Sequence, residues 1–408
     1  MAVKRTSLRA INTKIALSYD RVRYEPDVVG ELDPEWVLGL AALYGVRRPS
    51  EVIDVLDLGC GTGAQLERVA SMTSGRLVGT DLSRSACERA AERTMDLGDR
   101  VDVRCVDFLD LNRDDLGQFD LIYHVGVSYV IPAEVRTAAL ALIAECLRPG
   151  GVVVISYHSG TVPLLLAGIR QALRACIDGS RPEGEQVQAA RSRLHEIEGW
   201  LSRDGGDHAA MRAALRGLAR TNDVVFFHEM LNECFTPLST AGLEAELSSS
   251  GVHFLNWIKP GPFGELARAM DRALVADAVS FADGGYRYGV FAKCEVAEEV
   301  SARSPDLLWE TRLTRIDNDR GEPVFCDGSD NCLRVTNPVT EALLDLLSSE
   351  PYRFAELRTR VAGLFAGRLQ ESTVDEVLNR DLVGLWSRGL VRARWQPVPA
   401  AVSGTGPD

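Results

Sequence analysis

The stretch "VIDVLDLGCGTG", Val52 to Gly63, decides the fold of this chain. A mostly apolar run leads to the acid Asp57, and glycines then stand at positions 59, 61 and 63. A buried strand, a glycine turn and a helix give this pattern, because a Cβ in the turn would keep a ligand away from the backbone. The stretch therefore predicts the first strand of an α/β fold and a ligand-binding turn.

Short β-branched runs alternate with helical segments around this stretch, which is typical of βαβ units. The pattern predicts strands at 52–58, 76–80, 101–106, 119–125 and 151–157. Helices are expected between them at 64–73, 83–97 and 133–147. Two later strands at 252–257 and 286–296 would complete a doubly wound, seven-stranded, Rossmann-like sheet, with a helical insertion before the sixth strand.

These elements divide the chain into seven segments. We expect an N-terminal helical arm or cap at 1–48, the ligand-binding core at 49–160, a helical lid or middle (regulatory) domain at 161–250, and the last two core strands at 251–296. Charged and turn residues at 297–337 indicate a connector. Three helices and a strand hairpin indicate a winged-helix-like domain at 338–396, and the tail at 397–408 is expected to be disordered.

Composition disfavours several classes of partner. A net charge of −13 disfavours a nucleic-acid partner. The N-terminus lacks the apolar core of a secretory signal and no long apolar run follows, so we expect a cytoplasmic protein without a membrane partner. The nine cysteines form no CxxC pair, which predicts reduced thiols and no metal site.

The spacing of the glycines separates two classes of nucleotide ligand. Dinucleotide-binding turns read GxGxxG, whereas this turn reads GxGxG with an acid two residues before the first glycine. A carboxylate at Asp57 would repel a pyrophosphate, but it suits a ligand that carries an ammonium group. The turn therefore predicts S-adenosylmethionine as the cofactor, bound by Asp57, Gly59, Cys60 and Gly61.

Two further acids follow strands of the same sheet. Asp81, with Leu82 beside it, is placed to bridge the ribose hydroxyls, and its alternative is an acid that stabilises the N-terminus of the next helix. Asp107 is placed to accept the adenine amino group with Phe108 against the ring, and its alternative is a turn aspartate.

The fourth strand and its loop, "FDLIYHVGVSYVIP", should deliver residues to the transferred methyl group. His124 and Tyr129 are candidates there, with His124 contacting either the cofactor or the acceptor, or serving only as a buried core histidine. An amine acceptor must lose a proton, and His124, His158 or the pair His228 and Glu229 could assist. Tyr19 in the N-terminal arm could fold over the cofactor or pack elsewhere.

Taken in order, several stretches resemble one bacterial family. They are "LSYDRVRYEPDV" (17–28), "LAALYGV" (40–46), "VLDLGCGTGAQL" (55–66), "LVGTDLS" (77–83), "FDLIYHVGVSYVIPAEVR" (119–136), "LRPGGVVVISYHS" (147–159) and "FFHEMLNECFTPLSTAGLEAEL" (226–247). The chain resembles the class I methyltransferases that carry a methyltransferase regulatory domain, a group that includes the rickettsial type of protein-lysine methyltransferase.

The resemblance implies that cofactor contacts come from Asp57, Gly59, Gly61, Asp81, Asp107 and His124. It implies that Tyr19 lies near the active site, and that the region around His228 shapes the acceptor pocket. Two stretches depart from the family pattern, "HSGTVPLLLAG" (158–168) and "YRYGVFAKCEV" (286–296), both on the acceptor side.

The sequence therefore leaves the acceptor open. The first hypothesis is methyl transfer to an amine or carboxylate of a protein or peptide, with Tyr19, His124, Tyr129 and His228 at the catalytic site. The alternatives are a small natural product as acceptor, or a non-catalytic regulator that binds the cofactor. The winged-helix-like domain would serve as a docking surface or as the contact of a homodimer.

Overall fold

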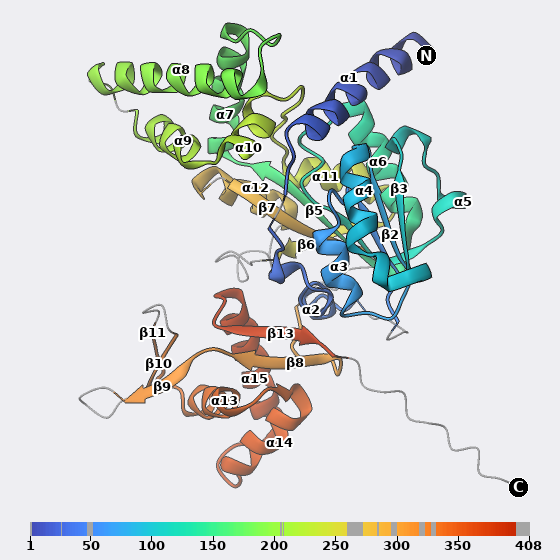
Figure 1. Cartoon of the computed structure of the whole chain (residues 1–408). Coiled ribbons are helices and arrows are strands. Elements are labelled where there is room, and N and C mark those ends of the chain that lie inside the picture. The colour runs from blue at the N-terminus through green and yellow to red at the C-terminus, as the bar shows by residue number, and fades with distance from the viewer. Residues whose placement is uncertain are drawn as a thin grey trace, which may run out of the picture. The chain divides into compact units, whose positions relative to one another are not determined.

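The computed structural model describes residues 2–25, 27–46, 52–204, 206, 208–258, 272–283, 285–294, 300–317, 323–327 and 332–396, so the tail expected at 397–408 lies outside the described residues. The chain forms two compact units (Figure 1). The first contains α1 (Ala2–Arg21) and every element from β1 to β7. The second contains α2 (Pro34–Leu43) and every element from β8 to β13, so the segment expected as one arm at 1–48 divides between the units.

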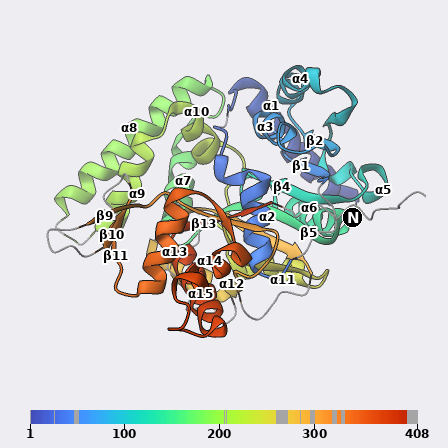
Figure 2. The same cartoon turned by 90° about the horizontal axis from the view of Figure 1, so that it is seen from below.

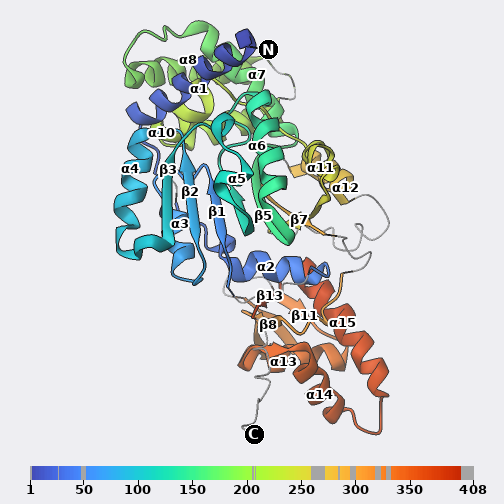
Figure 3. The same cartoon turned by 90° about the vertical axis from the view of Figure 1, so that its right-hand side faces the viewer.

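A seven-stranded sheet forms the centre of the first unit, in the order β3-β2-β1-β4-β5-β7-β6. Neighbours from β3 to β5 pair in parallel, and β7 pairs antiparallel with both β5 and β6. The strands are β1 (Val55–Leu58), β2 (Leu77–Asp81), β3 (Val101–Cys105), β4 (Phe119–His124), β5 (Leu147–Ser159), β6 (Val252–Trp257) and β7 (Gly285–Lys293). Figure 3 shows β3, β2, β1, β5 and β7 side by side. The predicted doubly wound methyltransferase-like sheet is confirmed.

Helices connect these strands because the strands are apolar on both faces. All four residues of β1 and all six of β4 are buried, as expected for parallel strands covered on both sides. The connecting helices are α3 (Ala64–Ala70), α4 (Arg84–Arg93), α5 (Arg113–Leu116), α6 (Ala133–Cys146), α11 (Thr240–Ser248) and α12 (Arg272–Asp283), with short turns at η2 (Met95–Arg100) and η3 (Phe108–Asp110). A further short turn, η1 (Gly30–Leu32), lies between α1 and α2, before the first strand. Ser83 caps α4 by accepting a hydrogen bond from the backbone N–H of Ala86.

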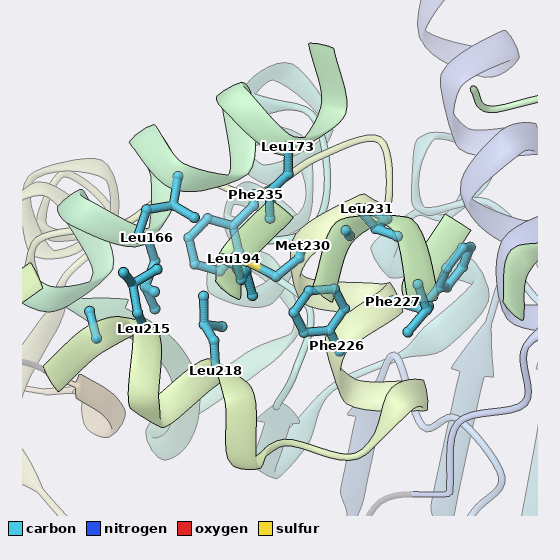
Figure 4. Close-up of a cluster of buried hydrophobic side chains, with 14 of the residues drawn as sticks. Leu166, Leu173, Leu194, Leu215, Leu218, Phe226, Phe227, Met230, Leu231 and Phe235 are labelled. Atoms are coloured by element: carbon cyan, nitrogen blue, oxygen red, sulfur yellow. The ribbon is translucent and has the colours of Figure 1, made fainter. Parts of the chain in front are cut away.

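The helical insertion before the sixth strand is also confirmed. It consists of α7 (Thr161–Cys176), α8 (Glu183–Arg203), α9 (Ala209–Arg220), α10 (Asp223–Phe226) and the π-helical turn η4 (Phe227–Leu231). Figure 2 shows α7 to α10 gathered together. These helices share a buried apolar cluster that includes Leu173, Leu215, Phe226 and Met230 (Figure 4). The apolar cluster joins the insertion to Tyr129 and Val130 of the first unit, so η4 packs against both.

In its described residues, the second unit contains two three-stranded sheets and, besides α2, three further helices. One sheet has the order β12-β8-β13 and the other β11-β10-β9. The strands are β8 (Leu307–Thr311), β9 (Thr314–Asp317), β10 (Pro323–Cys326), β11 (Cys332–Arg334), β12 (Tyr352–Arg353) and β13 (Val391–Trp395), and the helices are α13 (Pro338–Ser349), α14 (Phe354–Leu364) and α15 (Glu371–Ser387).

Two predictions about this unit need correction. The segment 297–337, expected as a connector, contains β8 to β11, because strands this short and this rich in charge resemble loops in sequence. The last strand, β13, pairs with β8 from that segment and not with a following strand, so the described residues contain no hairpin after α15. The three helices stand where they were expected, and the winged-helix assignment stays a prediction.

One cysteine pair also differs from expectation. Cys326 and Cys332 face each other across the antiparallel strands β10 and β11 and form a disulfide. The spacing of the cysteines in the sequence does not predict the disulfide, because the register of the two strands brings the thiols together.

In the described part of the chain, no helix is long and apolar enough to cross a membrane.

Candidate cofactor and acceptor site

The glycine turn lies at the carboxyl end of β1, as predicted. Gly59 has a φ of +100°, and a Cβ there would stand 2.3 Å from a side-chain carbon of Val127. Gly61 has a φ of +52°, and a Cβ there would meet open space. Gly59 is therefore required by close packing as well as by its φ, whereas Gly61 leaves bare backbone facing space that a ligand can fill.

Two acids lie directly beside this turn. Asp57 is buried, with 4% of its surface exposed. Burial, and then the nearby charge of Asp81, raise the pKa of Asp57 to about 7. Asp81 accepts hydrogen bonds from the backbone N–H groups of Gly61 and Ser83, each at 2.9 Å, while burial raises its pKa. Two acids at one turn, Asp57 buried and Asp81 half-buried, fit a ligand that brings positive charge.

The other residues expected at the cofactor lie around these acids. The thiol of Cys60 is buried against Gly79, so only its backbone can face a ligand. Leu82 follows Asp81 and is half-buried. Asp107 accepts from the backbone N–H of Leu109 at 3.0 Å and from the side-chain amide of Asn12 at 2.9 Å. The turn role and a ligand role of Asp107 are compatible, since each carboxylate oxygen has a second lone pair.

His124 lies between the turn and the ring of Phe108. Its Nδ1–H donates to the backbone carbonyl of Leu58 at 2.8 Å, and its ring centroid is 5.9 Å from that of Phe108. Burial lowers the pKa of His124 to about 4, so its imidazole is neutral near neutral pH. Its Nε2 has no hydrogen-bond partner among the described residues. This environment favours a contact to the cofactor over a role as proton acceptor.

Helix α1 lies across the same edge of the sheet. Its Asp20 accepts from the hydroxyl of Ser83 at 2.7 Å and from the backbone N–H and the hydroxyl of Ser85 at 3.1 and 2.9 Å. Its Asn12 holds Asp107, as described above. The N-terminal arm therefore touches the two places where the adenosine was expected, and neither Asn12 nor Asp20 had a recognisable signal in the sequence.

A second group of side chains begins where α1 ends. Tyr19 stacks on His228 of η4, with ring centroids 4.0 Å apart, and Tyr24 meets the same imidazole edge-on at 5.8 Å. Burial, followed by the charge of Asp81, Tyr24 and then Glu229, raises the pKa of the Tyr19 phenol. Tyr19 is therefore close both to an acid of the cofactor site and to Glu229.

Three more aromatic rings, those of Tyr129, His158 and Tyr286, lie together near the ends of strands β4, β5 and β7. Tyr129 meets His158 edge-on at 4.6 Å and Tyr286 at 5.7 Å. Glu229 places a carboxylate oxygen 3.7 Å from Nε2 of His158. We call Tyr19, Tyr24, Tyr129, His158, His228, Glu229 and Tyr286 the aromatic cluster. It unites the predicted Tyr19, Tyr129 and His228 with Tyr286, which no sequence argument singled out.

Several polar atoms of the cluster have no hydrogen-bond partner among the described residues. Nε2 of His228 donates to the backbone carbonyl of Val22 at 2.6 Å, which leaves Nδ1 as an unused acceptor. Nε2 of His158 is also without a hydrogen bond. Burial lowers the pKa of His228, so its ring is neutral. Unused buried acceptors beside a carboxylate call for a ligand that donates hydrogen bonds.

Known proteins resemble this chain in its core and beyond. Residues 55–151 match the family model of a methyltransferase domain. An uncharacterised protein of Rickettsia prowazekii is 26% identical over 224 residues, which are 54% of this chain and 89% of that protein. A dTDP-3-amino-3,4,6-trideoxy-alpha-D-glucopyranose N,N-dimethyltransferase of Streptomyces venezuelae is 34% identical over 119 residues, which are 28% of this chain and 46% of that enzyme.

Solved structures extend the likeness of the fold. PKMT2 from Rickettsia typhi has a TM-score of 0.76 and 19% sequence identity, covering 93% of this chain and 78% of that one. The structure of the same protein in complex with AdoHcy has a TM-score of 0.73 and covers 93% and 79% of the two chains.

The matched residues, the strand order and the acid-glycine turn define a methyltransferase domain. The chain is a class I methyltransferase that uses S-adenosylmethionine, as the sequence predicted. The bare backbone at Gly61, the buried Asp57 with the half-buried Asp81, and the unused Nε2 of His124 all fit that cofactor.

Proposed function

We propose that this enzyme methylates an amine of a protein or peptide, and that the aromatic cluster receives the amine. The observation that carries the proposal is the carboxylate of Glu229 beside the imidazole of His158, within a ring of neutral phenols. A protonated amine offers up to three N–H donors and a positive charge. Glu229 supplies the opposite charge, and His228 supplies an unused acceptor at Nδ1.

The tyrosines strengthen this choice. Burial raises the pKa of Tyr19, Tyr24, Tyr129 and Tyr286, so all four phenols stay neutral near neutral pH. Neutral aromatic faces attract cations, and they do so whether or not the cation carries methyl groups. A carboxylate acceptor would meet repulsion from Glu229. The cluster therefore favours the amine over the carboxylate among the acceptors left open by the sequence.

The chain's own residues then have defined tasks. Bound S-adenosylmethionine supplies a methyl group on a positively charged sulfur, so strong acid–base chemistry is unnecessary. Asp57, Asp81 and Asp107 would hold its amino-acid end, ribose and adenine. Glu229 and His158 hold the incoming ammonium and accept its proton, because only the free amine has a lone pair to react. Tyr129, which is buried, and Tyr19, which is half-buried, would limit the access of water to the space between.

Relatives support two versions of the acceptor. PKMT2, whose fold is similar over 93% of this chain, belongs to the rickettsial protein-lysine methyltransferases, which favours an amine on a polypeptide. The Streptomyces enzyme methylates the amine of a sugar nucleotide, which favours an amine on a small molecule as the second candidate. Both versions keep the same chemistry at Glu229.

Transfer of label from S-adenosylmethionine tests the proposal. Purified enzyme, labelled cofactor and cell extract fractionated by size should give label in polypeptide that resists mild base, since methylamines are stable where methyl esters hydrolyse. Glu229→Gln should reduce this labelling by at least about tenfold, because the charge that attracts the ammonium is lost. Glu246→Gln, at an exposed carboxylate that accepts from Thr137, is the matched control.

Each other outcome has a definite meaning. Base-labile label would contradict the amine. Base-stable label confined to small molecules would select the second candidate. Full labelling by Glu229→Gln would remove the aromatic cluster as the acceptor site.

A further inference from the structure

Glu229 lies in a π-helical turn whose carboxyl-terminal carbonyls are bound by side chains of another helix. Phe227–Leu231 forms a π-helical turn, which is rare and concentrated at functional sites. The turn stops at Asn232, whose ψ of 170° leaves the helix. The last carbonyls of any helix lack partners within it and must be satisfied by other groups.

Two arginines from α7 satisfy them. Arg170 donates from Nε to the carbonyl of Glu229 at 3.2 Å and from a guanidinium Nη to the carbonyl of Asn232. Arg174 donates to the carbonyls of Leu231 and Asn232. The two arginines are four residues apart and so share one face of α7. We call them the arginine clamp.

The clamp keeps its charge although Arg170 is buried. Burial, followed by the charge of Arg174, lowers the pKa of Arg170 to about 10, so it stays protonated near neutral pH. A positive charge at the carboxyl end of a helix is favourable. From the other side, Ser18 of α1 donates to the side-chain oxygen of Asn232 at 3.2 Å. The end of η4 is thus fixed between α7 and α1.

Glu229 and His158 are both connected to helix α7, Glu229 through the arginine clamp and His158 through the chain. His158 stands near the end of β5, and α7 begins three residues later at Thr161. Glu229 comes from η4, far along the chain, and its own carbonyl is held by Arg170 of α7. The distance of 3.7 Å between Glu229 and His158 therefore depends on the position of η4 relative to α7.

We infer that Arg170, supported by Arg174, is a positioning residue that sets Glu229 against His158 and so shapes the site for the acceptor ammonium. This inference rests on the proposed function for its meaning, but the geometry it describes can be tested without the acceptor. Arg170 holds main-chain carbonyls and acts on the reaction only through Glu229.

The test follows the His158 ring by nuclear magnetic resonance in the full chain, at fixed pH, with the signal assigned by His158→Gln. Glu229→Gln shows how the signal moves when the carboxylate is lost. Arg170→Met should move it in the same direction, and Arg170→Lys, whose ammonium can still donate to a carbonyl, should restore most of the wild-type position. The same should hold, more weakly, for Arg174→Met.

Arg191→Met is the matched control for lost packing and charge. Arg191 also joins helices of the insertion, donating to the carbonyl of Thr221 at 2.7 Å and stacking over Phe226 at 4.5 Å, but it holds no carbonyl of η4. The Arg191→Met substitution should lower the stability of the fold but leave the position of the His158 signal unchanged. A wild-type signal in Arg170→Met, or an equal shift in Arg191→Met, would overturn the inference. If Arg170→Met does not fold, Arg170→Lys and Arg174→Met decide alone.

A second readout links the clamp to the acceptor. n-Butylammonium, which mimics the end of a lysine side chain, is titrated into the protein saturated with S-adenosylhomocysteine. Its dissociation constant should rise about tenfold in Arg170→Met and less than about twofold in Arg191→Met, because small misplacements of a binding group are costly. Absence of binding to the wild type would count against the proposed function, and the His158 signal would still decide on the clamp.

Discussion

Asp57 carries the most informative charge in the cofactor site. Its carboxyl is buried beside Asp81, and its pKa lies at about 7 without a bound cation. A raised pKa means that Asp57 stabilises the ligand-free fold at acid pH and loses that contribution as the pH rises from about 4 to about 7. Without a ligand the Asp57 carboxyl is therefore favoured in its protonated form. A ligand with an ammonium group favours the ionised form, because the opposite charges attract.

Cofactor binding should therefore weaken as the pH falls. With a pKa of about 7, the ionised fraction of Asp57 falls from about one half at pH 7 to about 3% at pH 5.5, and we expect the affinity for S-adenosylmethionine to fall with it. Calorimetry across this range measures it. Asp57→Asn should bind more weakly at pH 7 and show little pH dependence. Asp110→Asn, at an exposed acid paired with Arg9, should keep the wild-type slope. A flat wild-type curve would contradict the pKa argument.

At this scale the sequence predicts the cofactor side better than the acceptor side. Asp57 lies in β1, Asp81 ends β2 and Asp107 follows β3, and each strand is a contiguous run of sequence, so local patterns place the three acids. Tyr286 faces His158 only because β7 pairs with β5 in one register, His158 opposite Tyr286. Glu229 reaches the same place only through a π-helical turn. Neither the pairing of distant strands nor a π-turn has a local signature.

At the scale of elements, α1 is held against the rest of the first unit by several polar side-chain contacts. It attaches through polar contacts at both ends, from Arg9 on Asp110 to Asp20 on Ser83 and Ser85. Of these, the Asp20 contacts are partly buried, whereas the Arg9 pair is exposed and should contribute little. The carboxyl-terminal end of α1, next to Tyr19, should therefore dominate its attachment.

Asp20→Ala should loosen α1 and speed the release of cofactor. Three hydrogen bonds to one charged acceptor are lost, and we expect S-adenosylhomocysteine to dissociate about tenfold faster. Stopped-flow fluorescence measures the dissociation rate. Arg9→Ala, at the far end of the same helix, should change it less than about twofold. Equal rates for Asp20→Ala and the wild type would show that α1 does not cover the cofactor.

At the scale of the whole molecule, the chain carries two separate cores. Leu56 and Ile122 are fully buried in the sheet of the first unit, and Leu343 and Leu378 are fully buried in the second. The division follows the helical and strand patterns that the sequence shows, except that α2 from the N-terminal segment and β8 from the expected connector contribute to the second unit. Those assignments depend on β8 pairing with β13 and on α2 packing against β13, which are long-range contacts.

Two cores predict two separable stabilities. Leu378→Ala should destabilise the second unit by about 2–5 kcal/mol, because the methyl groups removed leave a cavity in a fully buried site. Leu56→Ala should do the same to the first unit. S-Adenosylhomocysteine stabilises only the unit that binds it. In calorimetric unfolding it should therefore raise the midpoint temperature of the transition that Leu56→Ala lowers. The midpoint of the transition that Leu378→Ala lowers should not change. A single transition that responds equally to both substitutions and to the ligand would mean that the two cores unfold as one.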